Sequence, residues 1–250
     1  PKARSWGDVE QRAALEEAGR STREELAAEL RKAGFVAEDN RISHLLLRAE
    51  LDGILCCGEV KAGKPIYPLL ERRVPKTKQF TREEALANLA KRYFASHGPA
   101  AIQDFIWWSG LSVNDAKHAL EMVKPDFLSE TIASQTYWFS DPGSTPGAGK
   151  EAVYLLPAYD EFIISYKDRS ASLPSGNRDK TISNNGIFRP VIVVNGQVAG
   201  IWKRAIKRDQ VRVETEFFER PDEITARLVE KASLQYGRFL GKKVEVKHKS

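Results

Sequence analysis

The sequence predicts an α+β fold in which two consecutive helical units, each closed by a β-hairpin, precede a C-terminal α+β unit. Helix-capping signals and apolar periods recur in the same order in residues 1–78 and 79–141. A Pro/Gly/Ser-rich connector at residues 141–149 follows, and strand-like segments dominate from there on. The expected domains are therefore 1–78, 79–141 and 142–250. With 42% hydrophobic and 29% charged residues, the composition excludes a mostly disordered, collagen-like or coiled-coil chain.

The first unit reads as three helices and a hairpin. A first helix is expected at residues 9–19, and Ser21 with Glu24 and Thr22 with Glu25 form two overlapping capping boxes for a second helix that ends at Gly34. Apolar residues at helical spacing predict a third helix at residues 39–51. Strands are expected at residues 54–59 and 65–70, joined by a turn at residues 61–64.

The second unit repeats this order. Thr81 and Glu84 form a capping box for its first helix, and Pro99 is expected to begin the next helix, which runs to a turn at residues 109–111. Ser112 caps a third helix through Val123, and residues 127–133 and 136–139 read as paired strands. Two such units match the plan of tandem winged helices, although three helices with a hairpin also serve protein contacts.

The C-terminal unit is predicted from its strand signals. We expect a strand at residues 153–157, helical residues at 159–166, a polar loop at 174–186, and strands at 191–194 and 197–202 around the hairpin signal Asn195-Gly196. A strand at 211–217, a long helix at 221–240 and a short strand at 243–247 complete it.

The positive charge is concentrated in one stretch. Residues 160–212 hold 10 basic and 5 acidic side chains, an excess equal to the net charge of +5. Such a surplus suits a polyanionic partner, although a solvated basic surface is the alternative. The candidate DNA-binding residues are a basic cluster after the hairpin and the polar faces of both third helices: Lys203, Arg204, Lys207 and Arg208; Arg41, His44 and Arg48; Asn114, Lys117, His118 and Glu121.

No phosphate-binding loop, nucleophile elbow or metal-ligand spacing is present, so the sequence indicates no metal and no cofactor. One cluster stands out, because Tyr159, Asp160 and Glu161 directly follow an apolar strand and could face a cleft. An ion-pair network is the alternative. The adjacent Cys56 and Cys57 cannot form a disulfide framework, and no apolar run reaches the length of a membrane span, which predicts a cytoplasmic protein.

Several stretches together resemble one family. They are residues 48–54 (RAELDGI), 69–75 (LLERRVP), 94–99 (FASHGP), 104–111 (DFIWWSGL), 155–162 (LLPAYDEF), 189–196 (RPVIVVNG) and 200–204 (GIWKR). Over nearly the whole chain the sequence is similar to the winged-helix DNA-binding proteins of the AlkZ/YcaQ-like DNA glycosylase family. The resemblance implies tandem winged helices around a basic channel, and hydrolysis of the N-glycosidic bond of an alkylated or crosslinked purine without a cofactor. We expect a monomer that binds double-stranded DNA.

The family's catalytic Gln-x-Gln or Gln-x-Asp motif has no counterpart here. None of the seven glutamines is followed two positions later by Gln or Asp. The start at Pro1 fits a chain without the family's N-terminal winged helix, so the catalytic residues stay unassigned. The hypothesis is a DNA-binding part of a repair glycosylase. The alternative is a noncatalytic winged-helix module of transcription or protein-interaction type, which would select one DNA sequence and dimerise.

Overall fold

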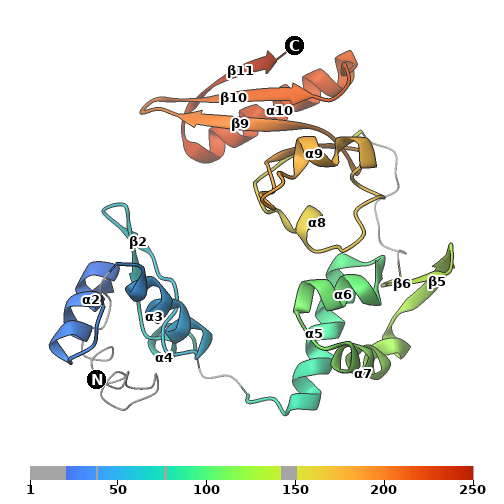
Figure 1. Cartoon of the computed structure of the whole chain (residues 1–250). Coiled ribbons are helices and arrows are strands. Elements are labelled where there is room, and N and C mark those ends of the chain that lie inside the picture. The colour runs from blue at the N-terminus through green and yellow to red at the C-terminus, as the bar shows by residue number, and fades with distance from the viewer. Residues whose placement is uncertain (1–20, 38, 76–77, 142–150, 250) are drawn as a thin grey trace. The chain divides into compact units, whose positions relative to one another are not determined.

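The computed structural model describes residues 21–37, 39–75, 78–141 and 151–249, and the chain divides into two compact units, Pro1–Gln79 and Phe80–Ser250. The predicted α+β class is confirmed (Figure 1). The expected helix at residues 9–19 and most of the connector lie outside the described residues. Among those that are described, no helix combines the length and apolar character needed to cross a membrane.

The described part of the first unit places helices α2 and α3 and the short helix α4 beside a small sheet. Of its two possible capping boxes, the one that forms joins Thr22 and Glu25, with Thr22 N donating to Glu25 at 2.7 Å. Helix α3 has the predicted bounds. The elements are β1 (Ser21–Thr22), α2 (Arg23–Lys32), α3 (Asp39–Leu51), β2 (Val60–Lys61), β3 (Lys64–Tyr67) and α4 (Leu70–Arg73), and the sheet order is β1-β3-β2.

The strand predicted at residues 54–59 is wrong. Only Leu55 forms a bridge, with Leu69, and the regular strand begins at Val60. The opposite segment contains Pro68, which accepts from Cys56 N but has no N–H to donate in return, so the pairing beside it stays irregular. The hairpin itself is present, with its turn at Ala62 and Gly63.

The second unit begins with three helices around an aromatic core. Tyr93, Phe94 and Phe105 are fully buried there, and the predicted caps Thr81 and Ser112 both form. The elements are α5 (Arg82–His97), β4 (Ala100–Ala101), α6 (Ile102–Ser109), α7 (Val113–Val123), the 3-10 turn η1 (Lys124–Asp126), β5 (Leu128–Ile132) and β6 (Gln135–Phe139), and the sheet order is β4-β6-β5.

The helix start predicted at Pro99 is also wrong. Helix α6 begins at Ile102, because Ala100 and Ala101 pair with Trp138 and Tyr137 as strand β4. Proline is favoured in the first turn of a helix, but here the two residues after Pro99 form a strand instead.

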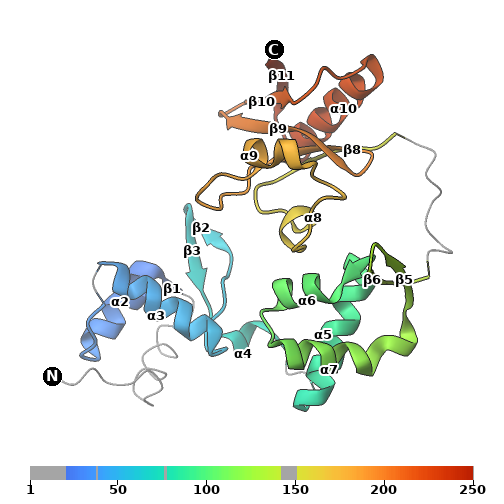
Figure 2. The same ribbon diagram turned by 45° about the vertical axis from the view of Figure 1, so that its right-hand side comes forward.

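The rest of the second unit is a five-stranded sheet of order β11-β10-β9-β8-β7 with helix α10 on one face (Figure 2). The side chains of β8 point alternately to the two faces of the sheet. Ile192 packs with Trp202 and Val229 beneath α10, while Val191 and Val193 pack on the other face. The elements are β7 (Val153–Leu156), α8 (Glu161–Ile164), η3 (Ser175–Asn177), α9 (Arg178–Thr181), β8 (Val191–Val194), β9 (Gln197–Ile206), β10 (Gln210–Phe217), α10 (Glu223–Leu240) and β11 (Lys243–Lys249).

Two predictions for this part need comment. The Asn195-Gly196 hairpin is confirmed, with both residues at positive φ, as a two-residue turn of this type requires. Residues 174–186, predicted as a polar loop, contain η3 and α9, because Thr181 and Ile182 are buried and anchor a helical turn against the sheet.

Candidate functional site

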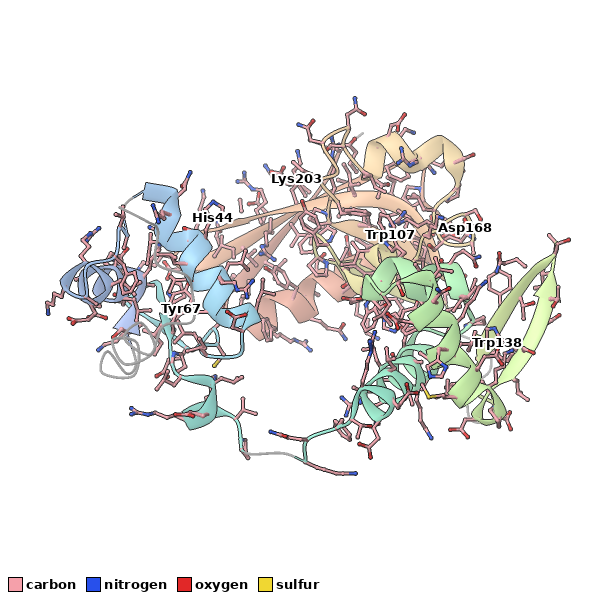
Figure 3. All side chains as sticks on the ribbon, turned by 60° about the horizontal axis from the view of Figure 1, so that its bottom comes forward. His44, Tyr67, Trp107, Trp138, Asp168 and Lys203 are labelled. Carbon is pink, nitrogen blue, oxygen red and sulfur yellow. The ribbon has the colours of Figure 1, made fainter. Side chains whose placement is uncertain are left out.

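Helix α6 and the end of α5 meet the segment around α8, near Trp107 and Asp168 in Figure 3. A network of polar contacts, which we call the junction network, joins them. Glu161 lies at its centre. Its carboxylate accepts hydrogen bonds from Trp108 Nε1 at 3.1 Å and from the Ser165 hydroxyl, and it lies 3.5 Å from His97 Nε2. The Ser165 bond, followed by those from Trp108 and His97, lowers the pKa of Glu161, so this carboxylate is charged at neutral pH.

His97 is held inside an aromatic cluster. Its ring stacks on Tyr93, with the ring centroids 4.7 Å apart, and Trp108 and Tyr166 lie at 5.6 and 6.1 Å. The side chain is only 17% exposed, and its Nδ1 contacts the Ser96 hydroxyl at 2.8 Å. One ring nitrogen therefore faces a hydroxyl and the other a carboxylate.

Asp104 is the most deeply buried carboxylate at this junction. The residue is 4% exposed, and its Oδ2 accepts from Ala101 N at 2.9 Å, which caps α6. Its Oδ1 accepts from Lys167 N at 2.9 Å and Asp168 N at 3.3 Å. One side chain thus fixes both the start of α6 and the segment that follows α8.

Buried tyrosine hydroxyls add to this connection. Tyr93 Oη donates to the Ser165 carbonyl at 3.1 Å, and Tyr166 Oη donates to the His97 carbonyl at 2.8 Å. Burial, reinforced by the nearby charge of Asp104, raises the pKa of both phenols, so both remain neutral donors.

Two adjoining cavities open at this junction, and we call them together the junction cavity. Their volumes are about 360 and 380 Å³. Asp104, Tyr137 and Asp168 line both. His97, Phe162, Tyr166 and the hairpin residue Gly196 line the first, and Gln103, Gln135 and Lys167 line the second. The hairpin turn is held nearby, since Gln197 Nε2 donates to the Ala171 carbonyl at 2.8 Å.

The three residues predicted to face a cleft have different positions. Tyr159 is 52% exposed, with a φ of 57° and its ring 5.8 Å from Phe188. Asp160 caps α8, accepting from Phe162 N at 3.0 Å. Only Glu161 joins the junction network, and none of the three lines the junction cavity.

The predicted basic cluster does not form one surface. Lys203 and Arg204 are adjacent on β9, so their side chains leave opposite faces of the sheet, and Arg204 lies 5.9 Å from the ring of Tyr236. Lys207 and Arg208 lie in the β9–β10 turn, at the end of β9 opposite to Asn195-Gly196, about 36 Å along the strand at ~3.3 Å per residue. All four are exposed and form no ion pair within the described part of the chain.

The third-helix candidates are exposed in both units. On α3, Arg41, His44 and Arg48 share one side, and Arg48 pairs with Asp52 at 2.8 Å. On α7, Asn114, Lys117, His118 and Glu121 are exposed; His118 contacts Glu83 at 2.5 Å and Glu121 pairs with Lys124. Within the described residues, Arg41 and Lys117 form no ion pair, so they are the cations of these faces that are available to a partner.

Sequence reasoning missed His97, Asp104, Tyr137, Tyr166 and Asp168 as a group. Asp104 follows Ala101 at capping-box spacing, but Ala has no capping side chain, so the usual signal is incomplete. The others lie at positions 97–168 of the chain, on α5, on β6 and after α8, and no local spacing predicts that they meet. In the described ranges, no three His, Cys, Asp or Glu side chains gather in a way that would hold a metal ion.

Comparisons with known proteins agree with the resemblance seen in the sequence. A family model described as "DNA glycosylase AlkZ-like" matches residues 7–239. Among solved structures, the Streptomyces sahachiroi DNA glycosylase AlkZ has a similar fold, with a TM-score of 0.70 and 20% sequence identity over 96% of this chain and 67% of that one. A search of curated proteins found no match. The family match spans nearly the whole sequence, and the chain therefore belongs to the AlkZ-like DNA glycosylase family.

Proposed function

We propose that this chain is the double-stranded-DNA-binding part of a repair glycosylase that acts on alkylated or crosslinked purines, and that it works as a monomer. In this proposal residues 1–78 and 79–141 are winged-helix domains, and residues 142–250 form an α+β domain. The observation that carries the proposal is the family match over residues 7–239.

The arrangement of helices and hairpins supports DNA binding. In each of the two helical parts, a helix preceding a β-hairpin exposes polar side chains, as a recognition helix does in winged-helix proteins: α3 before β2–β3 and α7 before β5–β6. The two faces differ in charge. Ion pairs neutralise much of α7, whereas on α3 only Arg48 is paired, with Asp52, and Arg41 and His44 are exposed without an ion pair among the described residues. We therefore propose that α3 and the β9–β10 turn contact the DNA phosphates, and that α7 contributes less to this contact.

The basic residues of β9 and its turn support a contact that does not depend on base sequence. Lys203, Lys207 and Arg208 are exposed, and no carboxylate of the described residues lies within ion-pair distance of them. Cations in this state can neutralise phosphates without first breaking an internal pair. Because Lys203 and Arg204 leave opposite faces of β9, only part of the cluster contacts one duplex.

The catalytic step is proposed to use residues outside this chain. The sequence has no Gln-x-Gln or Gln-x-Asp, so we assign the catalytic motif to no residue of this chain. This chain alone should therefore bind DNA without cleaving glycosidic bonds.

The experiment measures duplex affinity against salt concentration. Replacing Lys203, Arg204, Lys207 and Arg208 together by Gln should weaken binding to every duplex and reduce the slope of log K against log salt by about 0.9 for each phosphate that the variant no longer neutralises. The matched control replaces four paired cations, Arg82, Lys91, Lys124 and Lys249, by Gln, which removes the same charge.

Three outcomes would contradict the DNA-binding part of this proposal. An affinity that does not change with salt would rule out the phosphate contacts. Equal effects of the two quadruple variants would show that only net charge matters. Strong preference for one sequence in a random pool, together with dimerisation, would favour the noncatalytic regulator instead. Separately, release of 7-methylguanine from methylated DNA by this chain would contradict the placement of the catalytic motif.

A further inference from the structure

Two turns meet at the C-terminal end of helix α10: the β9–β10 turn and the turn between α10 and β11. Lys242 Nζ donates to the Arg208 carbonyl at 2.5 Å, and Lys243 N donates to the Asp209 carbonyl at 3.2 Å, so the two turns are joined. Five cations therefore lie at this end of the sheet, and we call them the basic tip: Lys207, Arg208, Arg238, Lys242 and Lys243.

The backbone that carries the basic tip is closely packed. Gly241 ends α10 with a φ of 63°, and its N–H donates to the Arg238 carbonyl at 3.1 Å. Gly237 allows β11 to approach the helix, because a Cβ at this position would lie 1.9 Å from Cγ2 of Val244. The side chains of the tip therefore project from a support that is fixed on both sides of the helix end.

The charge of the basic tip is largely uncompensated. Within the part of the chain that the structure describes, none of its five cations forms an ion pair, and all except the half-buried Lys242 are exposed. One carboxylate, that of the exposed Asp209, lies in the two turns. The C-terminus of a helix favours a nearby cation, but five cations exceed what that effect requires. An exposed surplus of this kind suits the closely spaced phosphates of a nucleic acid.

Phe239 projects from the same end of α10. Its side chain is 84% exposed, the highest value among the large apolar residues that the structure describes, and it directly follows Arg238. An aromatic side chain left in water gains free energy when a partner covers it. Proteins that unstack or bend DNA use the same combination, in which an apolar side chain enters between two base pairs while Lys and Arg hold the phosphates.

We propose that the basic tip holds the backbone of double-stranded DNA and that Phe239 enters the base stack as a wedge. This inference rests on the proposed function, which supplies duplex DNA as the partner, and it adds a contact with bases that the phosphate-binding cations do not make. Entry of a wedge requires unstacking, which costs least where a base pair is already mismatched. The chain should therefore prefer a duplex that contains a mismatch, and this preference should depend on Phe239.

The test compares two duplexes of equal length, one fully paired and one with a single central mismatch, by fluorescence anisotropy with the whole chain. The wild-type chain should bind the mismatched duplex about five- to tenfold more tightly. Phe239→Ala should reduce this ratio to below about twofold, whereas Phe239→Leu, which retains an apolar wedge, should keep most of it. Neither substitution removes a charge, so the slope of log K against log salt should not change.

A charge variant of the same tip should have the opposite effect. Arg238→Gln combined with Lys243→Gln should weaken binding to both duplexes and reduce the salt slope by about 0.9 for each phosphate that is no longer neutralised. The ratio between the two duplexes should stay as in the wild-type chain, because the wedge is intact.

Ile224→Ala is the matched control, because Ile224 is a 45% exposed apolar residue in the first turn of the same helix, beside Asp222 and Glu223 instead of cations. It should leave the ratio unchanged. A ratio that persists in Phe239→Ala, or an equal loss in Ile224→Ala, would overturn the proposal. If the wild-type chain binds both duplexes with equal affinity, the wedge is wrong while the DNA-binding function stands. If neither duplex shows saturable binding, the proposed function fails together with the wedge.

Discussion

Asp104→Ala tests whether one buried carboxylate fixes the junction between α6 and the segment after α8. The substitution removes the acceptor of three backbone N–H groups, at 2.9, 2.9 and 3.3 Å, in a side chain that is 4% exposed. Each buried donor left without a partner costs about 1–3 kcal/mol, and the longest bond contributes least. The free energy of unfolding of the second unit should therefore fall by about 2–5 kcal/mol.

The assay combines urea unfolding with amide hydrogen exchange. Exchange at the amides of Lys167 and Asp168 should accelerate at least about fivefold, because a loss above 1 kcal/mol changes the open population by that factor. Asp104→Asn should show an intermediate loss, since it retains one accepting oxygen but turns an amide donor toward a backbone N–H. Asp126→Ala is the control, because Asp126 is 50% exposed and its pair with Lys91 contributes about 0–1 kcal/mol.

The reasoning would be refuted if Asp104→Ala and Asp126→Ala reduced stability by similar amounts. It would also fail if the amides of Lys167 and Asp168 exchanged at the wild-type rate in Asp104→Ala. Either result would show that other interactions at the junction, such as those of the two tyrosine hydroxyls, hold the segment without the carboxylate.

Two further predictions concern packing and pH. Gly200→Ala should destabilise the sheet by about 1–3 kcal/mol in urea unfolding, because the added Cβ would lie 2.5 Å from the Glu216 carbonyl oxygen. The control is Gly176→Ala, which should change stability by less than about 0.5 kcal/mol, since no atom lies within 4 Å of the added Cβ. Equal effects of the two substitutions would contradict the close approach at Gly200. Glu161→Gln should lower Tm at pH 7 and have less effect at pH 3. Hydrogen bonds from Ser165 and Trp108 hold the pKa of Glu161 below its ordinary value of 4.5. The carboxylate therefore contributes fully to stability above pH 4.5, and this contribution is lost as the pH falls through the lowered pKa. Glu130→Gln on the exposed strand β5 controls for the loss of one carboxylate, and a Tm difference for Glu161→Gln that stays constant with pH would contradict this assignment.

Local chemistry allowed most of the secondary structure to be predicted. Three local patterns formed as predicted: the caps Thr81 with Glu84 and Ser112 with Asp115, and the turn Asn195-Gly196. Each is decided by residues a few positions apart, so a sequence pattern of the same length is enough to predict it. Where a prediction was wrong, a distant segment decided the outcome. The pairing of Ala100 with Trp138 moved the start of α6, and Pro68 on the opposite segment interrupted the strand expected at residues 54–59.

The candidate site was less accessible to sequence reasoning. Glu161 was identified because it follows an apolar strand, yet its partners Trp108 and His97 lie 53 and 64 positions earlier in the chain. Asp104 could not be distinguished from other helix-start carboxylates, since its significance comes from the amides of Lys167 and Asp168. The basic cluster was predicted as one surface because sequence proximity does not reveal that consecutive strand residues face opposite ways.

The contacts between α5–α6 and residues 161–168 should hold the second unit together when the backbone is cleaved in the connector. Hydrogen bonds from Tyr93, Trp107, Trp108 and Tyr166, with the Asp104 bonds, join parts of the chain on either side of the connector. These contacts do not require the peptide bonds of residues 142–150. The two sides are therefore suited to expression as separate polypeptides that reassemble. If the chain is split after Asp141, the strength of the junction can be measured as the binding affinity of one fragment for the other.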